Sequence, residues 1–196
     1  QTLMKNADTA MFHGKGLGKN TYQYFTAQMN IAVKRRMTLE SALRRAVLQK
    51  DFVLQYQPQI DLETGGILAV EALVRWRTED SGTVMPGDFI PLAEETGLIN
   101  EIGEWVLREG CRQAREWQRR GSRGLRLMVN LSAHELSQEG FVVHVEKALA
   151  ASGLPPDSLH LEIPEGYAMQ DLARTIETLR ELRSVGVHLA IDGFGA

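Results

Sequence analysis

After Asp51, short runs of apolar residues alternate with longer stretches whose apolar positions recur every three or four residues. The short runs have the length and composition of buried strands, and the longer stretches have the period of a helix with one apolar side. Each of the last three strand candidates follows a helical stretch, which favours a mainly parallel sheet. The predicted strands are Phe52 to Ile60, Ile67 to Trp76, Leu125 to Leu131, Leu159 to Ile163 and Val187 to Ile191.

Two helical stretches between these strands have a clear apolar side. Glu101 to Arg119 carries Ile102, Trp105, Val106 and Ala114 on one side, and Met169 to Val185 carries Met169, Leu172, Ile176, Leu179 and Leu182. Such helices cover the outside of a parallel sheet or barrel. A complete (β/α)8 barrel takes about 250 residues and residues 51–196 supply about five strands, so we predict an incomplete α/β, TIM-barrel-like fold whose C-terminal strands are missing.

The pattern before Asp51 contains helices and no strand. Residues 7–20 predict a short helix through Ala10, Met11 and Phe12, which a series of glycines stops. Residues 27–50 have loosely spaced apolar positions among many basic and polar residues, at Ile31, Val33, Met37, Leu39, Leu43 and Val47. This second stretch predicts a linker helix that packs on one side and leads into the following domain.

The composition is that of a globular protein, since 43% of the 196 residues are hydrophobic and 24% are charged. The 22 basic and 25 acidic residues give a net charge of −3, which provides no general attraction for nucleic acids or anionic membranes. The single cysteine, Cys111, excludes an internal disulfide and favours a cytoplasmic location; we interpret it as a packed or surface thiol. No apolar run approaches the roughly 20 residues of a membrane span, although a parent protein could be anchored elsewhere.

Alternation along the first two strands places polar residues on one face. Successive side chains of a strand point to opposite faces, so Glu71, Leu73 and Arg75 share a face of the second strand. The same parity gathers three glutamines on the first strand, Gln55, Gln57 and Gln59. We therefore expect the two strands to line one polar interior.

Oxygen-bearing side chains also lie at the ends of the three later strands, at Asn130, Glu162 and Asp192. Because the active sites of barrels form at the carboxyl ends of the strands, we expect these residues and Glu71 to converge. A cluster with oxygen ligands only favours Mg²⁺ or Mn²⁺ over zinc.

Each of these residues also has a purely structural interpretation. Asn130 and Asp192 have the positions of turn formers or helix N-caps. Glu71 lies among apolar residues, and burying a carboxylate costs on the order of several kcal/mol unless a metal or a partner such as Arg75 compensates it. The strand pattern alone leaves these alternatives open.

From about Asp51 to Ala196 the chain resembles the EAL domain family, because several motifs follow one another in the family's order. The signature itself is Glu71-Ala72-Leu73, followed by Val74-Arg75-Trp76. The flanking motifs are Tyr56-Gln57-Pro58, Phe89-Ile90-Pro91-Leu92-Ala93-Glu94, Val129-Asn130-Leu131-Ser132, Leu161-Glu162-Ile163-Pro164-Glu165 and Ile191-Asp192-Gly193-Phe194-Gly195. One tripeptide alone would carry no weight, whereas chance is a poor explanation for the ordered set.

The resemblance implies a barrel that opens cyclic di-GMP to linear pGpG with two divalent cations, Mg²⁺ or Mn²⁺. By matching position it implies metal ligands at Glu71, Asn130, Glu162 and Asp192, with Glu71 and Asp192 as catalytic residues. It implies substrate contacts at Gln57, Leu73 and Arg75, with Arg75 directed towards a phosphate. Glu165 is similar to a glutamate that holds the metal-site loop.

A second resemblance covers the beginning of the chain. Ala7 to Phe12, followed by Lys15 and by Gly18-Lys19-Asn20, is similar to the last helix and turn of a GGDEF (diguanylate cyclase type) domain, without its catalytic loop. We expect residues 1–26 to be a C-terminal GGDEF remnant, residues 27–50 a linker helix, and residues 51–196 an EAL domain truncated at its C-terminal side. The implied partners are cyclic di-GMP, a preceding GGDEF-type domain in the parent protein and a second copy in a homodimer, but no DNA or RNA polymer.

The chain departs from the family's pattern at three places. Gly193 stands where the family normally has a second aspartate, and glycine offers no side-chain oxygen to a metal. Pro164 and Gly166 replace a threonine and a serine or threonine whose hydrogen bonds normally shape the following loop. A lysine, a further glutamate and a glutamine that the family carries on later strands are not among the 196 residues.

These departures leave more than one function open. The first is a cyclic di-GMP phosphodiesterase of which this chain is a part, with low or absent hydrolysis by the chain as written. The second is a catalytically inactive receptor for cyclic di-GMP, or a dimerisation scaffold. A third, an unrelated (β/α)8 metal hydrolase, keeps the oxygen cluster and drops the nucleotide.

Overall fold

The computed structural model of the protein describes residues 3–4, 6–8, 10–11, 24–78, 82–164 and 172–193. The chain forms two compact units, Gln1–Leu48 and Gln49–Ala196. The described residues 3–4, 6–8 and 10–11 are helical, as predicted for the positions they share with residues 7–20, and the glycines expected to stop this helix lie outside the described residues. No helix in the described parts of the chain is long and apolar enough to cross a membrane.

The predicted linker helix is α2 (Ala27–Gln49), but its predicted apolar side was wrong at Ile31 and Met37. Met29, Leu43 and Ala46 are buried, whereas Ile31 and Met37 are exposed. Helical positions six residues apart are rotated by roughly a third of a turn, so Ile31, Met37 and Leu43 cannot share one side.

Within its described residues, the second unit is built on a six-stranded sheet in the order β1-β2-β4-β5-β6, with the short β3 paired to β2. β2, β4, β5 and β6 run parallel to one another, in an incomplete TIM-barrel-like arrangement. The five predicted strands are confirmed within two residues at each end. The short strand β3 was not predicted. The bounds are β1 (Phe52–Ile60), β2 (Ile67–Thr78), β3 (Gly82–Val84), β4 (Arg126–Asn130), β5 (Leu159–Pro164) and β6 (His188–Asp192).

β1 is antiparallel to β2, unlike the other principal pairs of the sheet. The connection, residues 61–66, is too short for the crossover that a parallel pair requires. In the register of this hairpin Gln57 lies opposite Glu71, and Gln55 lies opposite Leu73. Because directly paired residues share a face, the glutamines of β1 and the polar residues of β2 lie on the same face of the sheet, as expected from their parity.

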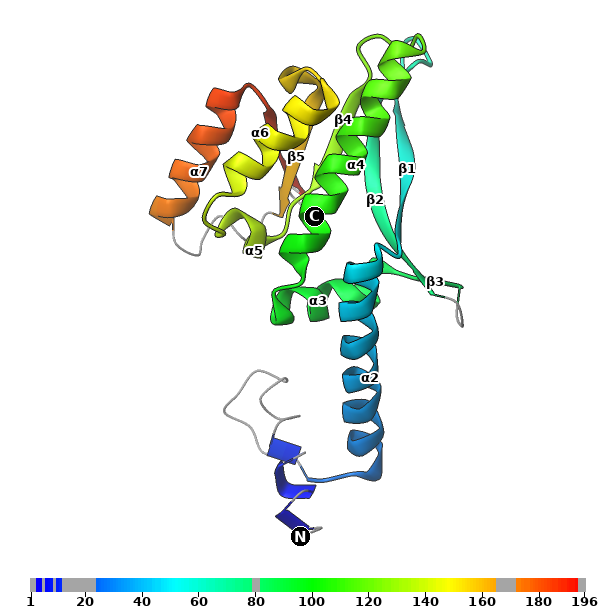
Figure 1. The fold of residues 1–196 in the computed structure, drawn as a ribbon, viewed down its shortest axis with the longest axis vertical. Helices are drawn as coiled ribbons and strands as arrows, with labels where there is room; N and C mark the ends of the chain where they lie inside the picture. The colour runs from blue at the N-terminus through cyan, green and yellow to red at the C-terminus, as the bar shows by residue number, and fades with distance from the viewer. Residues whose placement is uncertain are drawn as a thin grey trace. The chain divides into compact units, whose positions relative to one another are not determined.

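Helices cover the other face. Figure 1 shows α4, α6 and α7 lying side by side along the sheet. The bounds are α3 (Pro86–Thr96), α4 (Ile99–Arg119), α5 (Ala133–Leu136), α6 (Phe141–Ser152) and α7 (Leu172–Val185), with a 3-10 turn at Pro156–Ser158. The apolar side predicted for α4 is confirmed, whereas in α7 Thr175 and Leu182 are buried and Ile176 is exposed. Met169 and the side chain of Leu172 lie outside the described part of α7.

The core lies between the sheet and these helices. Alternate residues of β4 and β5 are buried there, including Leu127, Val129, Leu159 and Leu161. Gly110 of α4 lies so close to Leu127 that a Cβ would be 3.2 Å from its Cδ2 atom, so glycine allows the helix to approach the strand. The intervening residues of the same strands point to the opposite face, which is where the predicted polar site lies.

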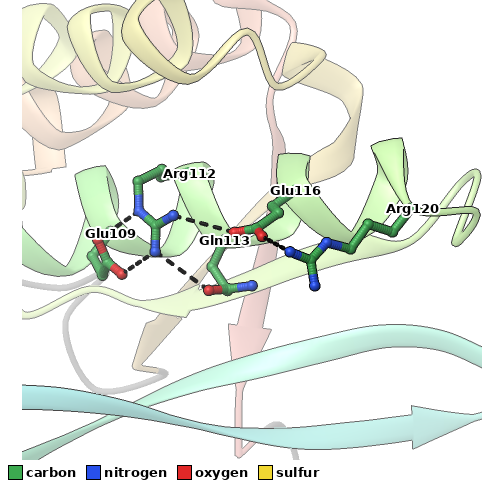
Figure 2. A network of polar contacts seen from close by, with 5 residues as sticks. All are labelled: Glu109, Arg112, Gln113, Glu116 and Arg120. Carbon is green, nitrogen blue, oxygen red and sulfur yellow. Dashed lines mark hydrogen bonds and ion pairs between the residues drawn. The ribbon is translucent and has the colours of Figure 1, made fainter.

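The solvent side of α4 carries a chain of ion pairs (Figure 2). Arg112 binds Glu109 at 2.6 Å and Glu116 at 3.3 Å, and it also donates to Gln113. Glu116 in turn pairs with Arg120. Exposed pairs at this spacing contribute about 0.3–0.5 kcal/mol each, so the network stabilises the helix modestly.

Candidate functional site

Glu71 and Asn130 are joined directly, although they are 59 residues apart in the chain. The side-chain amide of Asn130, at the end of β4, donates to Oε1 of Glu71 on the neighbouring β2 at 2.7 Å. Ser132, and not Asn130, caps α5. No ion pair joins Glu71 to Arg75, and the structure describes both residues. The structure therefore places Asn130, and not the predicted partner Arg75, against the carboxylate of Glu71.

Glu162 belongs to the same group of side chains. It lies on β5 directly beside Asn130, and the carbonyl of Glu162 accepts a hydrogen bond from the amide of Leu131 at 2.8 Å. Burial raises the pKa of Glu162, and the negative charges of Glu71 and Asp192 raise it further. In the register of β5 and β6, Ala190 lies opposite Glu162 and Asp192 lies opposite Pro164, so Asp192 lies on the same face of the sheet as Glu162.

Asp192 is the last residue of β6 and is paired in register with Pro164 of β5. Its side chain is exposed, and Gly193 follows it with a φ of +69°. A Cβ at Gly193 would meet no atom within 4 Å. Asp192 therefore ends its strand immediately before a left-handed turn with open space around it.

The three predicted substrate contacts lie along the same face of the β1–β2 hairpin. Gln57 is paired with Glu71, and Leu73 and Arg75 follow along β2. The guanidinium of Arg75 donates from Nε to Oε1 of Gln55 and from Nη1 to the carbonyl of Val74, each at 2.9 Å. The strand pattern placed Gln55 on this face but did not reveal that it orients Arg75.

The side-chain oxygens on this face of the sheet are suitable ligands for a hard divalent cation such as Mg²⁺ or Mn²⁺. Among the residues that the structure describes, no three His, Cys, Asp or Glu side chains are placed so that they already form a metal site. The oxygens of Glu71, Asn130, Glu162 and Asp192 are nevertheless those that Mg²⁺ or Mn²⁺ prefers. A cation would also offset the repulsion that Glu71 and Asp192 add to the effect of burial at Glu162, so the chemistry of these side chains suits a metal.

The sequence pattern of the EAL domain matches residues 40–196. This chain belongs to the EAL domain family, the cyclic di-GMP phosphodiesterase family. The match covers most of the chain, including each strand of the sheet and each residue of the polar face. It excludes an unrelated metal hydrolase.

Two curated relatives come from Pseudomonas aeruginosa. The bifunctional diguanylate cyclase/cyclic di-GMP phosphodiesterase MucR is 43% identical over 193 residues, which are 98% of this chain and 28% of MucR. The cyclic di-GMP phosphodiesterase NbdA is 38% identical over 195 residues, which are 100% of this chain and 25% of NbdA. This EAL domain chain thus spans about a quarter of the length of these relatives.

Solved structures have the same fold. The PaMucR phosphodiesterase in its complex with c-di-GMP superposes with a TM-score of 0.77 and 43% identity, over 81% of this chain and 64% of that chain. The FimX EAL domain from Pseudomonas aeruginosa bound to c-di-GMP has a TM-score of 0.71 and 29% identity, over 81% of this chain and 63% of that chain.

Two further predictions for this EAL domain concern the loop after β5 and the single cysteine. Glu165, the predicted loop-stabilising residue, and Gly166 lie outside the described residues. Cys111 is fully buried, and its burial raises the pKa of the thiol to about 12. Cys111 is therefore a packed thiol of α4 and not a nucleophile.

Glu135, a buried residue of α5, was not among the residues predicted from the sequence. Its side chain is only 4% exposed, and its carboxylate is bound by the backbone and hydroxyl of Ser132. Burial raises the pKa of Glu135 to about 7; the hydrogen bonds from Ser132 oppose this rise and the charge of Glu94 adds to it. The Ser-x-x-Glu spacing of residues 132–135 is the capping-box pattern that could have revealed it.

Proposed function

We propose that this EAL domain belongs to a metal-dependent phosphodiesterase that converts cyclic di-GMP to linear pGpG, and that hydrolysis by the 196-residue chain is low or absent. The observation that carries the proposal is the meeting of Glu71, Asn130 and Glu162 on one face of the sheet. MucR and NbdA, whose names include this activity, support it.

In this proposal the residues of the polar face divide into metal ligands and nucleotide contacts. Glu71, Asn130, Glu162 and Asp192 hold the cations, and Glu71 and Asp192 are the catalytic ligands. When bound, two divalent cations supply Lewis acidity and a water acidic enough for in-line attack on one phosphodiester.

The hairpin β1–β2 holds the dinucleotide beside these ligands. Arg75 binds a phosphate through the fork of its guanidinium, which Gln55 already orients. Gln57 and Leu73, on the same face, contact the nucleotide. A phosphate held in one orientation lowers the entropy cost of reaching the geometry for in-line attack.

The proposed impairment rests on Gly193. A glycine offers no oxygen to a second metal or to the attacking water, and loss of one electrostatic stabiliser typically costs about 10²–10³ in rate. Pro164 and Gly166 also remove hydroxyls from the loop after β5, and Glu165, which we propose to stabilise that loop, lies beside both.

The second candidate is an inactive receptor for cyclic di-GMP or a dimerisation scaffold. It is favoured by one specific observation: Gly193 alters the metal side of the site while Gln57 and Arg75 keep the nucleotide side intact. In either case we propose a cytoplasmic domain that follows a GGDEF-type domain and pairs as a homodimer.

The test is to incubate the purified chain with cyclic di-GMP and Mn²⁺ and to separate the products by chromatography. We expect the dinucleotide to bind and to be converted to pGpG slowly or not at all. A turnover in the ordinary enzyme range of about 1–10³ per second would contradict the proposed impairment. Glu71→Gln should abolish any conversion, and Glu104→Gln, at an exposed position of α4, serves as the matched control.

A further inference from the structure

The loop that follows β4 is fixed on both sides. Asn130, the last residue of the strand, binds Glu71. Leu131 is buried, and its amide donates to the carbonyl of Glu162 on β5. Ser132 is the N-cap of α5 and thus connects the loop to Glu135. The direction in which Asn130 presents its side chain therefore depends on how Ser132 is held.

Ser132 and Glu135 hold each other by reciprocal hydrogen bonds. Oε2 of Glu135 accepts from the backbone amide of Ser132 at 2.9 Å and from its hydroxyl at 2.6 Å. The hydroxyl oxygen of Ser132 accepts from the backbone amide of Glu135 at 3.2 Å. α5 spans only Ala133–Leu136, so this capping box, rather than a long helix, gives the loop its rigidity.

Gly103 of α4 makes room for the carboxylate of Glu135. A Cβ at this position would lie 1.7 Å from Oε1 and 2.6 Å from Cδ of Glu135. Real Cβ atoms do not approach so closely, so any other residue at position 103 displaces the carboxylate. Gly103 lies within a helix, where glycine is otherwise less favourable than alanine by roughly 0.5–1 kcal/mol.

We propose that Glu135 is a positioning residue that sets Asn130 against Glu71 by holding Ser132, and that Gly103 exists to admit its carboxylate. The side chain of Glu135 has no bond to Asn130 or to Glu71, so it acts through the loop and not as a ligand. The effect of this loop on metal affinity rests on the proposed function. The role of Glu135 in fixing the Asn130 side chain does not.

The first measurement is the NMR signal of the Asn130 side-chain amide, which its bond to Glu71 shifts away from the position of a free amide. Glu135→Ala should move this signal towards the free position. Glu135→Gln keeps an acceptor for Ser132, since glutamine also forms capping boxes, and should leave the signal in place. Unchanged Asn130 signals in the alanine variant would overturn the proposal, whatever the metal does.

The second measurement separates positioning from general loss of structure. Gly103→Ala should reproduce the effect of Glu135→Ala, even though alanine strengthens a helix. The double variant should be no worse than Glu135→Ala alone, because the new Cβ then meets no carboxylate. If the effects of Gly103→Ala and Glu135→Ala add in the double variant, Gly103 does not act through the carboxylate of Glu135. The matched control is Gly87→Ala in α3, where a Cβ meets no atom within 4 Å.

Titration with Mn²⁺ alone gives the functional readout. Residues that orient a ligand typically change metal affinity by about 10- to 100-fold, so Glu135→Ala and Gly103→Ala should weaken binding by this factor and Glu135→Gln should not. If Glu135→Ala and Gly103→Ala both bind Mn²⁺ as tightly as the unmodified chain, the loop does not influence metal affinity and this part of the inference is wrong. Failure of the unmodified chain to bind Mn²⁺ would instead count against the proposed function, and the Asn130 signal would still decide the positioning role.

Discussion

Glu71 shows how much a single residue reveals before its neighbours are known. Its place among apolar residues of a strand indicated that its carboxylate needs a partner, and parity placed it on the face of Gln57 and Arg75. The choice of Asn130 over Arg75 could not be predicted, because it depends on the register between β2 and β4 and on the bond that Gln55 makes with Arg75.

Removing the amide of Asn130 should weaken cation binding. Asn130→Ala leaves the carboxylate of Glu71 without its donor and removes one proposed ligand, so we expect the Kd for Mn²⁺ to rise by about 10- to 100-fold. Isothermal titration measures this change. Glu146→Ala, at an exposed position of α6, should bind as the unmodified chain does, and an equal loss in both variants would contradict the assignment.

Replacing Gly193 by aspartate should raise hydrolysis. The position has open space for a side chain, and aspartate tolerates a left-handed φ better than most residues, although it costs about 1–2 kcal/mol there. If the missing carboxylate limits catalysis, pGpG formation should increase, by up to about 10²–10³. Gly193→Ala has the same backbone strain without the oxygens, and an equal gain in both variants would disprove this explanation.

Arg75→Lys should lower the affinity for cyclic di-GMP. A lysine keeps the charge but loses the planar fork that binds a phosphate with two hydrogen bonds, so a loss of about tenfold, near 1.4 kcal/mol, is expected. The matched control is Arg77→Lys, which lies exposed on the same strand. Titration calorimetry with cyclic di-GMP compares the two variants. Equal affinities of Arg75→Lys and Arg77→Lys would show that Arg75 does not contact the nucleotide.

At the scale of elements, periodicity was most informative where one face is buried and the other is polar. The strands and α4 have this contrast and were predicted closely. α7 and α2 were placed correctly, but their apolar sides were wrong at Ile176, Ile31 and Met37. The antiparallel pairing of β1 follows from the length of its connection. The capping box of α5 is visible in the sequence, but the burial of Glu135 depends on Gly103, which is distant in the chain.

The buried carboxyl of Glu135 should make stability depend on pH. Its pKa is raised from 4.5 to about 7, so the folded state holds the proton more tightly than the unfolded state. Stability from this group is present in full below about pH 4.5 and is lost as the pH rises through about 7, a total of about 3 kcal/mol.

Glu135→Gln removes this titration and keeps the acceptor for Ser132. The free energy of unfolding of the variant, relative to the unmodified chain, should therefore increase between pH 5 and pH 8 in urea denaturation. A difference in the free energy of unfolding that stays constant across this pH range would show that folding does not raise the pKa of Glu135. Glu94→Gln provides a second check, because removing its charge should shift the transition of Glu135 to lower pH.

At the scale of the whole second unit, the sheet divides two kinds of chemistry. One face is apolar and packs against the helices, and the other gathers carboxylates, amides and Arg75 from strands far apart in the sequence. Order along the chain predicted this division, because alternate residues of a strand face opposite ways. The alternation of residues could not predict which polar groups bind one another, since those contacts depend on the register and side-chain conformations of neighbouring strands.

At the scale of the whole site, we propose that Glu71, Asn130, Glu162 and Asp192 together hold divalent cations. Anomalous diffraction from crystals of the chain soaked in Mn²⁺ tests it most directly. We expect an anomalous peak from Mn²⁺ bound by oxygens of Glu71, Asn130 and Glu162, with Asp192 beside it. Crystals in which Mn²⁺ is absent from this face, or is bound only by other residues, would contradict it.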